Sequence, residues 1–242
     1  MRVALFRNIL IAVLVSIDCL LEFKPVFATT TASEYRALGL SYRARERYPE
    51  AIGLLKKSVE IEPQNLSGWV MLGWTQHLAG QENAAVSSLI QALVRDPTSV
   101  PALNALGIVY LVSGELTAAV VAHTWAAILK PENEIAYYNL SLSFHRLRLY
   151  ESAIVTANKA ATLEPTNPHP LVALAIAHWD KGDRTAAQQA YGKARNLDSR
   201  YNNPAFLAHL QKAGFSSDQI QTTKRILHYL LLLPNDVHQP LH

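Results

Sequence analysis

Four prolines recur at a fixed interval along this chain: positions 63, 97, 131 and 165 are each 34 residues apart. Counting back 31 positions from each proline sets repeat starts at 32, 66, 100 and 134, and the next start falls at 168. The twentieth position of all five repeats is alanine, namely Ala51, Ala85, Ala119, Ala153 and Ala187. The seventh position is always leucine, namely Leu38, Leu72, Leu106, Leu140 and Leu174. A fixed period of this kind is typical of an array in which neighbouring units stack to bury apolar faces that no single unit can cover.

Each repeat carries two apolar faces at helical spacing. Positions 4, 7, 8 and 11 share one face of a helix, and positions 20, 24 and 27 share one face of a second helix. Small residues at positions 8 and 20 allow the two helices to approach closely. Gly80, Gly114 and Gly182, all at position 15, are candidate C-caps between the helices. The pattern predicts an all-α chain of helical hairpins.

A more detailed sequence motif is most complete in one of the repeats. The second repeat contains Trp69-Val70-Met71-Leu72-Gly73, and the eleventh position is Tyr42 in the first repeat and Tyr110 in the third. This arrangement resembles the tetratricopeptide repeat family, whose pattern is an aromatic residue, Leu-Gly, Tyr, Ala, a bulky residue, Ala and a closing Pro. The resemblance covers residues 32–199 as five repeats. It implies a right-handed α-α superhelical solenoid of tetratricopeptide helix hairpins.

The repeat pattern weakens toward the C-terminus. Pro204–Ala213 is predicted to form one more helix of the first type, ended by Gly214. Ser216 with Gln219 has capping-box spacing and should open a longer helix to about Leu233. We interpret residues 200–233 as a degenerate repeat with capping helices, which a solenoid needs at its end. Residues 234–242 are expected to form a flexible tail.

The first residues have a different character. Arg2 and Arg7 precede the apolar run Ile9–Val15, and small residues, Val26 and Ala28, occupy the −3 and −1 positions of a cleavage site. This pattern predicts a secretory signal peptide, residues 1–28, with cleavage between Ala28 and Thr29. The apolar run is shorter than the roughly 20 residues that span a bilayer. The stretch after it is longer and more charged than signal tails usually are, so an uncleaved membrane anchor over residues 9–23 stays open as the alternative.

The sequence carries no motif for catalysis or for a cofactor. It has no Gly-x-Gly loop, no Gly-x-Ser-x-Gly and no His-Glu-x-x-His. Its nine histidines form no cluster with acidic residues at metal-ligand spacing, and the only cysteine, Cys19, lies in the signal segment. His123 occupies position 24, a buried apolar position, where we expect a hydrogen-bonded core histidine. The formal net charge of +3 is too small for a dedicated nucleic-acid binder. We expect no enzyme activity, cofactor, metal or small-molecule substrate.

The resemblance also implies a binding surface, because the concave face in this family is lined by first-helix positions such as 2, 5, 6, 9, 12 and 13. The corresponding candidate partner-binding residues are Val70, Trp74, His77, Asn104, Ile108, Tyr138, Asn139, Leu142, His145, Ile176 and Trp179. The groove lacks the Lys and Arg residues with which several family members hold a C-terminal carboxylate. We therefore expect an apolar or amphipathic peptide segment or helix, anchored by aromatic side chains and held by the two asparagine amides. In the alternative interpretation, positions 5 and 9 pack helix against helix and leave little groove exposed.

Together these observations predict a non-enzymatic protein-interaction scaffold or adaptor. The signal peptide predicts export to the periplasm or an equivalent lumenal space, where the scaffold would serve complex assembly. The alternative is a membrane-anchored assembly or secretion accessory factor for a membrane or envelope complex. In that case the membrane contact would be made only by the N-terminal segment. An enzymatic accessory of glycosyl transfer is disfavoured, because assigning residues 32–233 to repeats leaves no catalytic domain.

Overall fold

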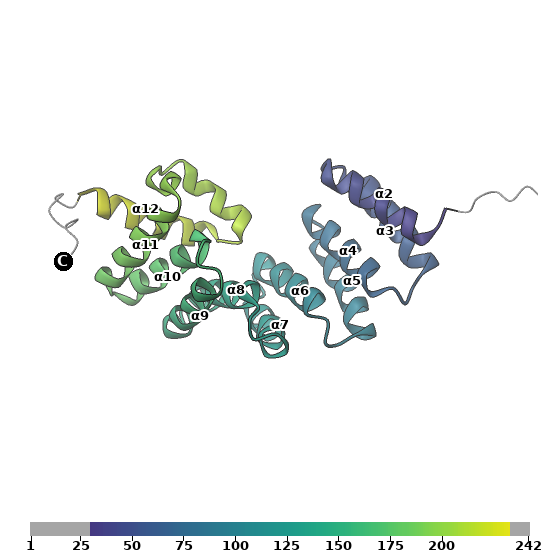
Figure 1. Cartoon of the computed structure of the whole chain (residues 1–242), viewed down its shortest axis with the longest axis horizontal. Helices are drawn as coiled ribbons and strands as arrows, with labels where there is room; N and C mark the ends of the chain where they lie inside the picture. The colour runs from purple at the N-terminus through teal and green to yellow at the C-terminus, as the bar shows by residue number, and fades with distance from the viewer. Residues whose placement is uncertain (1–29, 233–242) are drawn as a thin grey trace, which may run out of the picture.

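The computed structural model describes residues 30–232, and all regular structure in this part of the chain is helical. Five antiparallel hairpins follow one another in a curved array (Figure 1). They are α2 (Ala32–Ala44) with α3 (Tyr48–Ile61), α4 (Leu66–Leu78) with α5 (Glu82–Arg95), α6 (Val100–Ser113) with α7 (Leu116–Leu129), α8 (Glu134–Arg146) with α9 (Tyr150–Leu163), and α10 (Pro168–Lys181) with α11 (Arg184–Leu197). The array is therefore an all-α solenoid.

Three shorter or terminal helices complete the described part. They are the 3₁₀ helices η1 (Ser199–Asn202) and η2 (Phe206–Ala213) and the α-helix α12 (Ser217–Leu232). The predicted signal peptide with its cleavage site at Ala28 and Thr29, the alternative anchor at 9–23 and the tail at 234–242 lie outside the described residues.

The first helix of each hairpin begins at a side-chain cap that recurs with the 34-residue period. Thr31, Asn65, Ser99, Asn133 and Asn167 each accept a hydrogen bond from a backbone N–H in the first turn. The Asn65 Oδ1 atom accepts from Gly68 N at 3.0 Å, and Ser99 Oγ accepts from Ala102 N at 3.4 Å. Because the first N–H groups of a helix have no partner within it, such caps fix where each repeat starts.

The turn inside each hairpin has a residue in the left-handed region at position 15. Gly80, Gly114 and Gly182 have φ values of 72°, 86° and 103°. Glu46 and Arg148 adopt φ values of 58° and 60° at the same position, although neither is a glycine. All five hairpin turns therefore share the same backbone geometry, even where a residue other than glycine must adopt the less favourable left-handed conformation.

Within the first three hairpins, a glycine at position 8 faces a large residue at position 24. A Cβ atom on Gly39 would lie 2.9 Å from Leu55 Cγ, and one on Gly73 would lie 2.7 Å from Leu89 Cγ. Both leucines are fully buried. The glycine therefore makes room for a large side chain of its own hairpin, as the spacing of small residues predicted.

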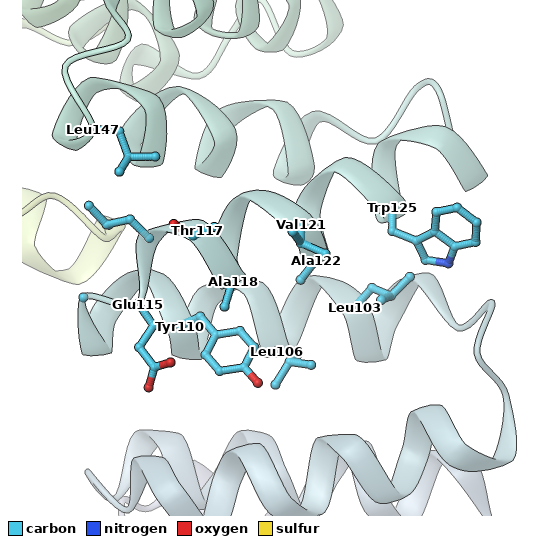
Figure 2. A pocket seen from close by; sticks show the side chains of 12 residues that line it. Leu103, Leu106, Tyr110, Glu115, Thr117, Ala118, Val121, Ala122, Trp125 and Leu147 are labelled. Carbon is cyan, nitrogen blue, oxygen red and sulfur yellow. The ribbon is translucent and has the colours of Figure 1, made fainter.

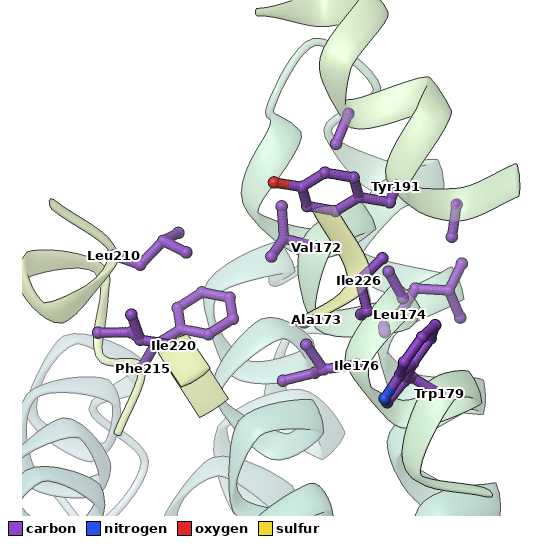
Figure 3. Packing of buried hydrophobic residues seen from close by; sticks show 14 of the residues in the cluster. Val172, Ala173, Leu174, Ile176, Trp179, Tyr191, Leu210, Phe215, Ile220 and Ile226 are labelled. Atoms are coloured by element: carbon purple, nitrogen blue, oxygen red, sulfur yellow. The ribbon is translucent and has the colours of Figure 1, made fainter. Parts of the chain in front are cut away.

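The chain after the fifth hairpin folds back onto the repeats. We call η2 and α12 (Phe206–Leu232) the C-terminal unit. Its buried residues Phe215, Ile220 and Ile226 join one apolar core with Val172 and Ile176 of α10 (Figure 3). Helix α12 contacts both α10 and α11. The C-terminal unit therefore covers the last repeats, as a terminal cap must.

The segment predicted as a further first-type helix, Pro204–Ala213, is a 3₁₀ helix over Phe206–Ala213 instead. Gly214 ends it with φ 85°. The carbonyl of Phe206 is engaged by the ring nitrogen Nδ1 of His209. This side-chain bond competes with the backbone bonds of an α-helix, and Pro204 has no N–H to donate.

Candidate binding surface on the first helices

The predicted groove residues fall into two groups that the fold treats differently. Those on α4 and α6 remain partly exposed, and we call this part the open half. Most of those on α8 and α10 are buried under the C-terminal unit, and we call this part the covered half. The difference arises because the chain folds back only as far as repeats three to five.

Trp74 is the centre of the open half. It lies half-buried on α4 and packs with Val70 against an apolar cluster that includes Leu89 and Leu106. The ring of His77 lies 5.1 Å from that of Trp74, centroid to centroid. His77 Nδ1 lies 2.8 Å from Glu82 Oε2, so the first residue of α5 holds this ring in place. Part of an aromatic surface is thereby exposed on a rigid helix.

Two exposed residues extend the open half beyond those predicted. Leu78 is 41% exposed on α4, and Val112 is 50% exposed on α6. Both occupy position 13, an inner-face position of the family from which no candidate residue was chosen. Ile108 lies half-buried on α6. Position 13 belongs to the family's inner face, so apolar residues at this position were the signal that could have identified Leu78 and Val112 from sequence.

The amides expected to hold a ligand backbone bond within the protein. Asn104 Nδ2 donates to Asn133 Oδ1 at 3.3 Å, and Asn133 Nδ2 donates back to Asn104 Oδ1 at 3.0 Å. Asn133 is also the N-cap of α8. Asn139 Nδ2 donates to the carbonyl of Ile135 at 2.9 Å. In this structure both predicted asparagines therefore stabilise the repeats.

The covered half is filled by the chain itself. Leu142 and Ile176 are fully buried, and Asn139, His145 and Trp179 are nearly so. The Tyr138 hydroxyl donates to the carbonyl of Ala213 at 2.6 Å. These residues are brought together, but what they bind is the C-terminal unit of the same molecule.

Polar contacts fix α12 at this place. Gln219, which is 1% exposed, donates through Nε2 to the carbonyl of Leu142 at 3.2 Å and lies 3.2 Å from His145 Nδ1. Its Oε1 accepts from Ser216 N at 2.9 Å, which closes the capping box at the start of α12. The rings of Trp179 and Tyr229 meet edge to face at 5.4 Å. Helix α12 is therefore held over α8 and α10 by contacts with residues at repeat positions 9 and 12.

Asp180 is the main charged group beneath α12. Its Oδ2 atom lies 3.1 Å from His145 Nε2 and 3.5 Å from Thr222 Oγ1. Burial raises the pKa of this carboxyl, but the hydrogen bond from His145 and the charges of His145, Arg225 and Arg184 outweigh it. The pKa of Asp180 is consequently held below its usual value. The carboxylate therefore stays ionised and ties α10 to the C-terminal unit.

His123 is buried as expected but does not have the expected hydrogen bond. Neither ring nitrogen has a partner of normal geometry, although the Gly107 backbone lies close by. Burial lowers the pKa of His123 to about 4, and the Gly107 backbone opposes this only in part. The neutral ring therefore acts as an apolar filler of position 24.

Within residues 30–232, no three His, Cys, Asp or Glu side chains gather as a metal site. The same part of the chain contains no helix that is long and apolar enough to cross a membrane.

Known proteins resemble both the sequence and the fold. Sequence patterns of the tetratricopeptide repeat match residues 35–67 and 105–168. The crystal structure of MamA is 27% identical, with a TM-score of 0.62, and the match covers 70% of this chain and 92% of MamA. A thermophilic TPR protein of Thermus thermophilus is 21% identical, with a TM-score of 0.59, over 76% of this chain and 98% of that one.

A curated relative gives a partial match. The BBSome complex member BBS4 of Bos taurus is 26% identical over 144 residues, which are 60% of this chain. The match spans only 28% of the length of that protein. Together with the structural matches, these comparisons confirm that the chain contains tetratricopeptide repeats, a fold that typically serves protein interaction without catalysis.

Proposed function

We propose that the protein is a non-enzymatic scaffold that binds an apolar or amphipathic segment of a partner protein on the open half. One observation carries this proposal. The covered half already holds a helix, α12, through positions 9 and 12 of the first helices. The same positions in the second repeat are Trp74 and His77, and the C-terminal unit does not reach them.

The covered half serves as an internal example of the binding mode. There, Leu142 and Ile176 bury apolar surface, aromatic rings meet edge to face, and Gln219 supplies the polar contact. The open half offers an aromatic ring at position 9 in Trp74, together with exposed Leu78 on α4 and exposed Val112 on α6. An amphipathic partner helix with a bulky apolar stripe fits this surface.

Crosslinking followed by purification from native membrane and exported fractions tests the proposal. Wild type is compared with Trp74→Arg and with Val94→Arg, which places the same charge on a residue of α5 that is 70% exposed. Circular dichroism first establishes that both variants are folded. A partner recovered with wild type and Val94→Arg but lost with Trp74→Arg supports the open half. Equal recovery with both variants contradicts it.

We further propose that the scaffold acts outside the cytosol, in the periplasm or an equivalent lumenal space. The support is the sequence pattern of residues 1–28, with cleavage between Ala28 and Thr29. Cleavage there leaves intact the N-cap of α2, where Thr31 N donates to Glu34 Oε2 at 2.7 Å and Glu34 N donates to Thr31 Oγ1 at 3.2 Å.

The N-terminus of the protein isolated from its natural source separates export from anchoring. A chain that begins at Thr29 supports a released scaffold. A chain that retains Arg2–Ala28 supports the alternative, a membrane-anchored assembly factor held by residues 9–23. In either case the partner is a protein, and neither nucleic acid nor a small-molecule substrate is part of the proposal.

A further inference from the structure

A second surface lies at the turns between the paired helices and along α7. It begins with an apolar hollow of about 860 Å³ on α6 and α7. Figure 2 shows Leu106 and Tyr110 from α6 beside Val121 and Trp125 from α7, with Leu147 at the end near the α8–α9 turn. These residues occupy none of the first-helix positions assigned to the concave groove.

The hollow exposes large apolar side chains. Val121 is 65% exposed, Trp125 is 46% exposed and Leu147 is 36% exposed. Trp125 is fixed in place, because its Nε1 donates to the carbonyl of Pro97 at 3.3 Å. Exposed tryptophan on a rigid helix, beside aliphatic neighbours, is characteristic of the anchoring centre of a protein interface.

A polar pocket of about 560 Å³ adjoins the hollow. Leu116 lines both, so the two meet at this residue. The polar pocket is lined by Arg146, Arg148 and Arg225, with Asp180 and Asp218 as its acidic residues. The three guanidinium groups thus converge on one space from α8, the α8–α9 turn and α12.

The two acidic residues offset the charge of the three arginines only in part. In the part of the chain that the structure describes, none of these three arginines forms an ion pair with a carboxylate. Asp180 is occupied by His145 and Thr222. Burial lowers the pKa of Arg146, and the charge of Asp218 opposes this shift. Guanidinium groups in such a setting favour a carboxylate ligand.

Arg148 also has an unfavourable backbone conformation. It adopts φ 60° at position 15, where Gly80, Gly114 and Gly182 occupy the equivalent turn. A residue with a side chain adopts this left-handed backbone less favourably than glycine does. The arginine is therefore present at this position despite a cost to folding, consistent with a use for its side chain at the pocket.

From these observations we infer that the hollow and the arginine pocket form one docking site for an acidic amphipathic segment of a second protein. Bulky apolar side chains of that segment lie against Val121 and Trp125, and a glutamate or aspartate near one end reaches Arg148 and Arg225. The apolar hollow opposes a nucleic acid or a free phosphate as occupant, since neither carries an apolar face to cover it. This site is separate from the open half.

Selection from a phage-displayed library of random 12-residue peptides, using the full chain as bait, tests the inference. The expected family of peptides carries two or more large apolar residues followed by Asp or Glu. Affinity of the consensus peptide is then measured by fluorescence anisotropy. Replacing its acidic residues with Gln or Asn should weaken binding at least about tenfold, the value of a charge-assisted hydrogen bond.

Matched variants locate the peptide. Arg148→Gln with Arg225→Gln, and separately Val121→Arg, should each weaken binding at least about tenfold. Arg43→Gln with Arg45→Gln removes the same charge from the first repeat, and Val94→Arg adds charge to another exposed valine. Both controls should leave binding unchanged, as should Trp74→Arg on the open half.

Four results would overturn the inference. They are the enrichment of no peptide family, a family without acidic residues, an equal loss in the control variants, and a chain that self-associates through Val121. Analytical ultracentrifugation of wild type and Val121→Arg detects the last, which would assign the hollow to a second copy of this chain.

Discussion

Gly107 and His123 are packed so closely that the first must be glycine. A Cβ atom on Gly107 would lie 2.5 Å from Nε2 of His123 and 2.6 Å from its Cε1. The same relationship joins position 8 to position 24 in the two preceding repeats, but with leucine in place of histidine. In the fourth repeat Ser141 stands at position 8, and the residue at position 24 is reduced to Ala157. In the first four repeats the two positions therefore share one volume, whereas the fifth repeat combines Ala175 with the large, buried Tyr191.

Gly107→Ala should destabilise the protein by about 1–2 kcal/mol. Overpacking costs about 1–3 kcal/mol, and the better helix propensity of alanine recovers part of it. The matched control is Gly53→Ala, because a Cβ on Gly53 meets nothing within 4 Å. That change should stabilise the helix by about 0.5–1 kcal/mol. Urea denaturation of both variants measures the two effects, and equal effects would contradict the packing argument.

His123→Leu should stabilise the protein most strongly in acid. Burial lowers the pKa of His123 to about 4 from 6.5, so the unfolded chain binds more protons between these pH values. Wild-type stability therefore falls as pH drops from 6.5 toward 4, by roughly 3 kcal/mol from this group. Leucine, which stands at position 24 in the first two repeats, cannot titrate.

The measurement for this prediction is the free energy of unfolding from pH 7 to pH 4. The difference between His123→Leu and wild type should widen toward pH 4. His228→Gln, on an exposed residue of α12, serves as the control. If the wild-type and His123→Leu curves stay parallel, the buried histidine does not govern the acid sensitivity.

Gln219→Ala should loosen the C-terminal unit. The substitution removes the hydrogen bonds that Gln219 makes to the carbonyl of Leu142 and to the N–H of Ser216, at a cost of about 1–3 kcal/mol. Gln221→Ala removes the same side chain from an exposed position two residues further and should change stability by less than about 0.5 kcal/mol. Hydrogen exchange over α12 should rise in the first variant alone; unchanged protection would mean that apolar packing suffices to hold the helix.

Asn104→Leu should cost about 1–2 kcal/mol of stability. It removes the reciprocal amide pair with Asn133, whose own side chain caps α8. Asn158→Leu, on an exposed position of α9, is the matched control. Thermal unfolding distinguishes the two variants. If the Asn104→Leu variant is as stable as wild type, the amide pair is not needed for stability. The ligand contact predicted for Asn104 from the sequence would then still stand.

Much of the fold follows from local and periodic features of the sequence. The 34-residue period sets the number of hairpins, because each repeat contains one cap, two apolar faces and one turn. The close approach of Gly39 to Leu55 and of Gly73 to Leu89 also follows from spacing alone. Such features act over one or two helical turns or between adjacent helices, so a single sequence contains them.

Only the tertiary structure decides which inner-face residues stay exposed and which are buried by the C-terminal unit. Leu142 and Trp74 occupy the same repeat position, yet Leu142 is fully buried and Trp74 is half-exposed. The cause is a contact between Leu142 and Gln219, which are 77 residues apart. No periodic pattern predicts where a terminal helix folds back. The arginine pocket likewise depends on this return, since Arg225 lines the same pocket as Arg148 only because α12 lies across the last repeats.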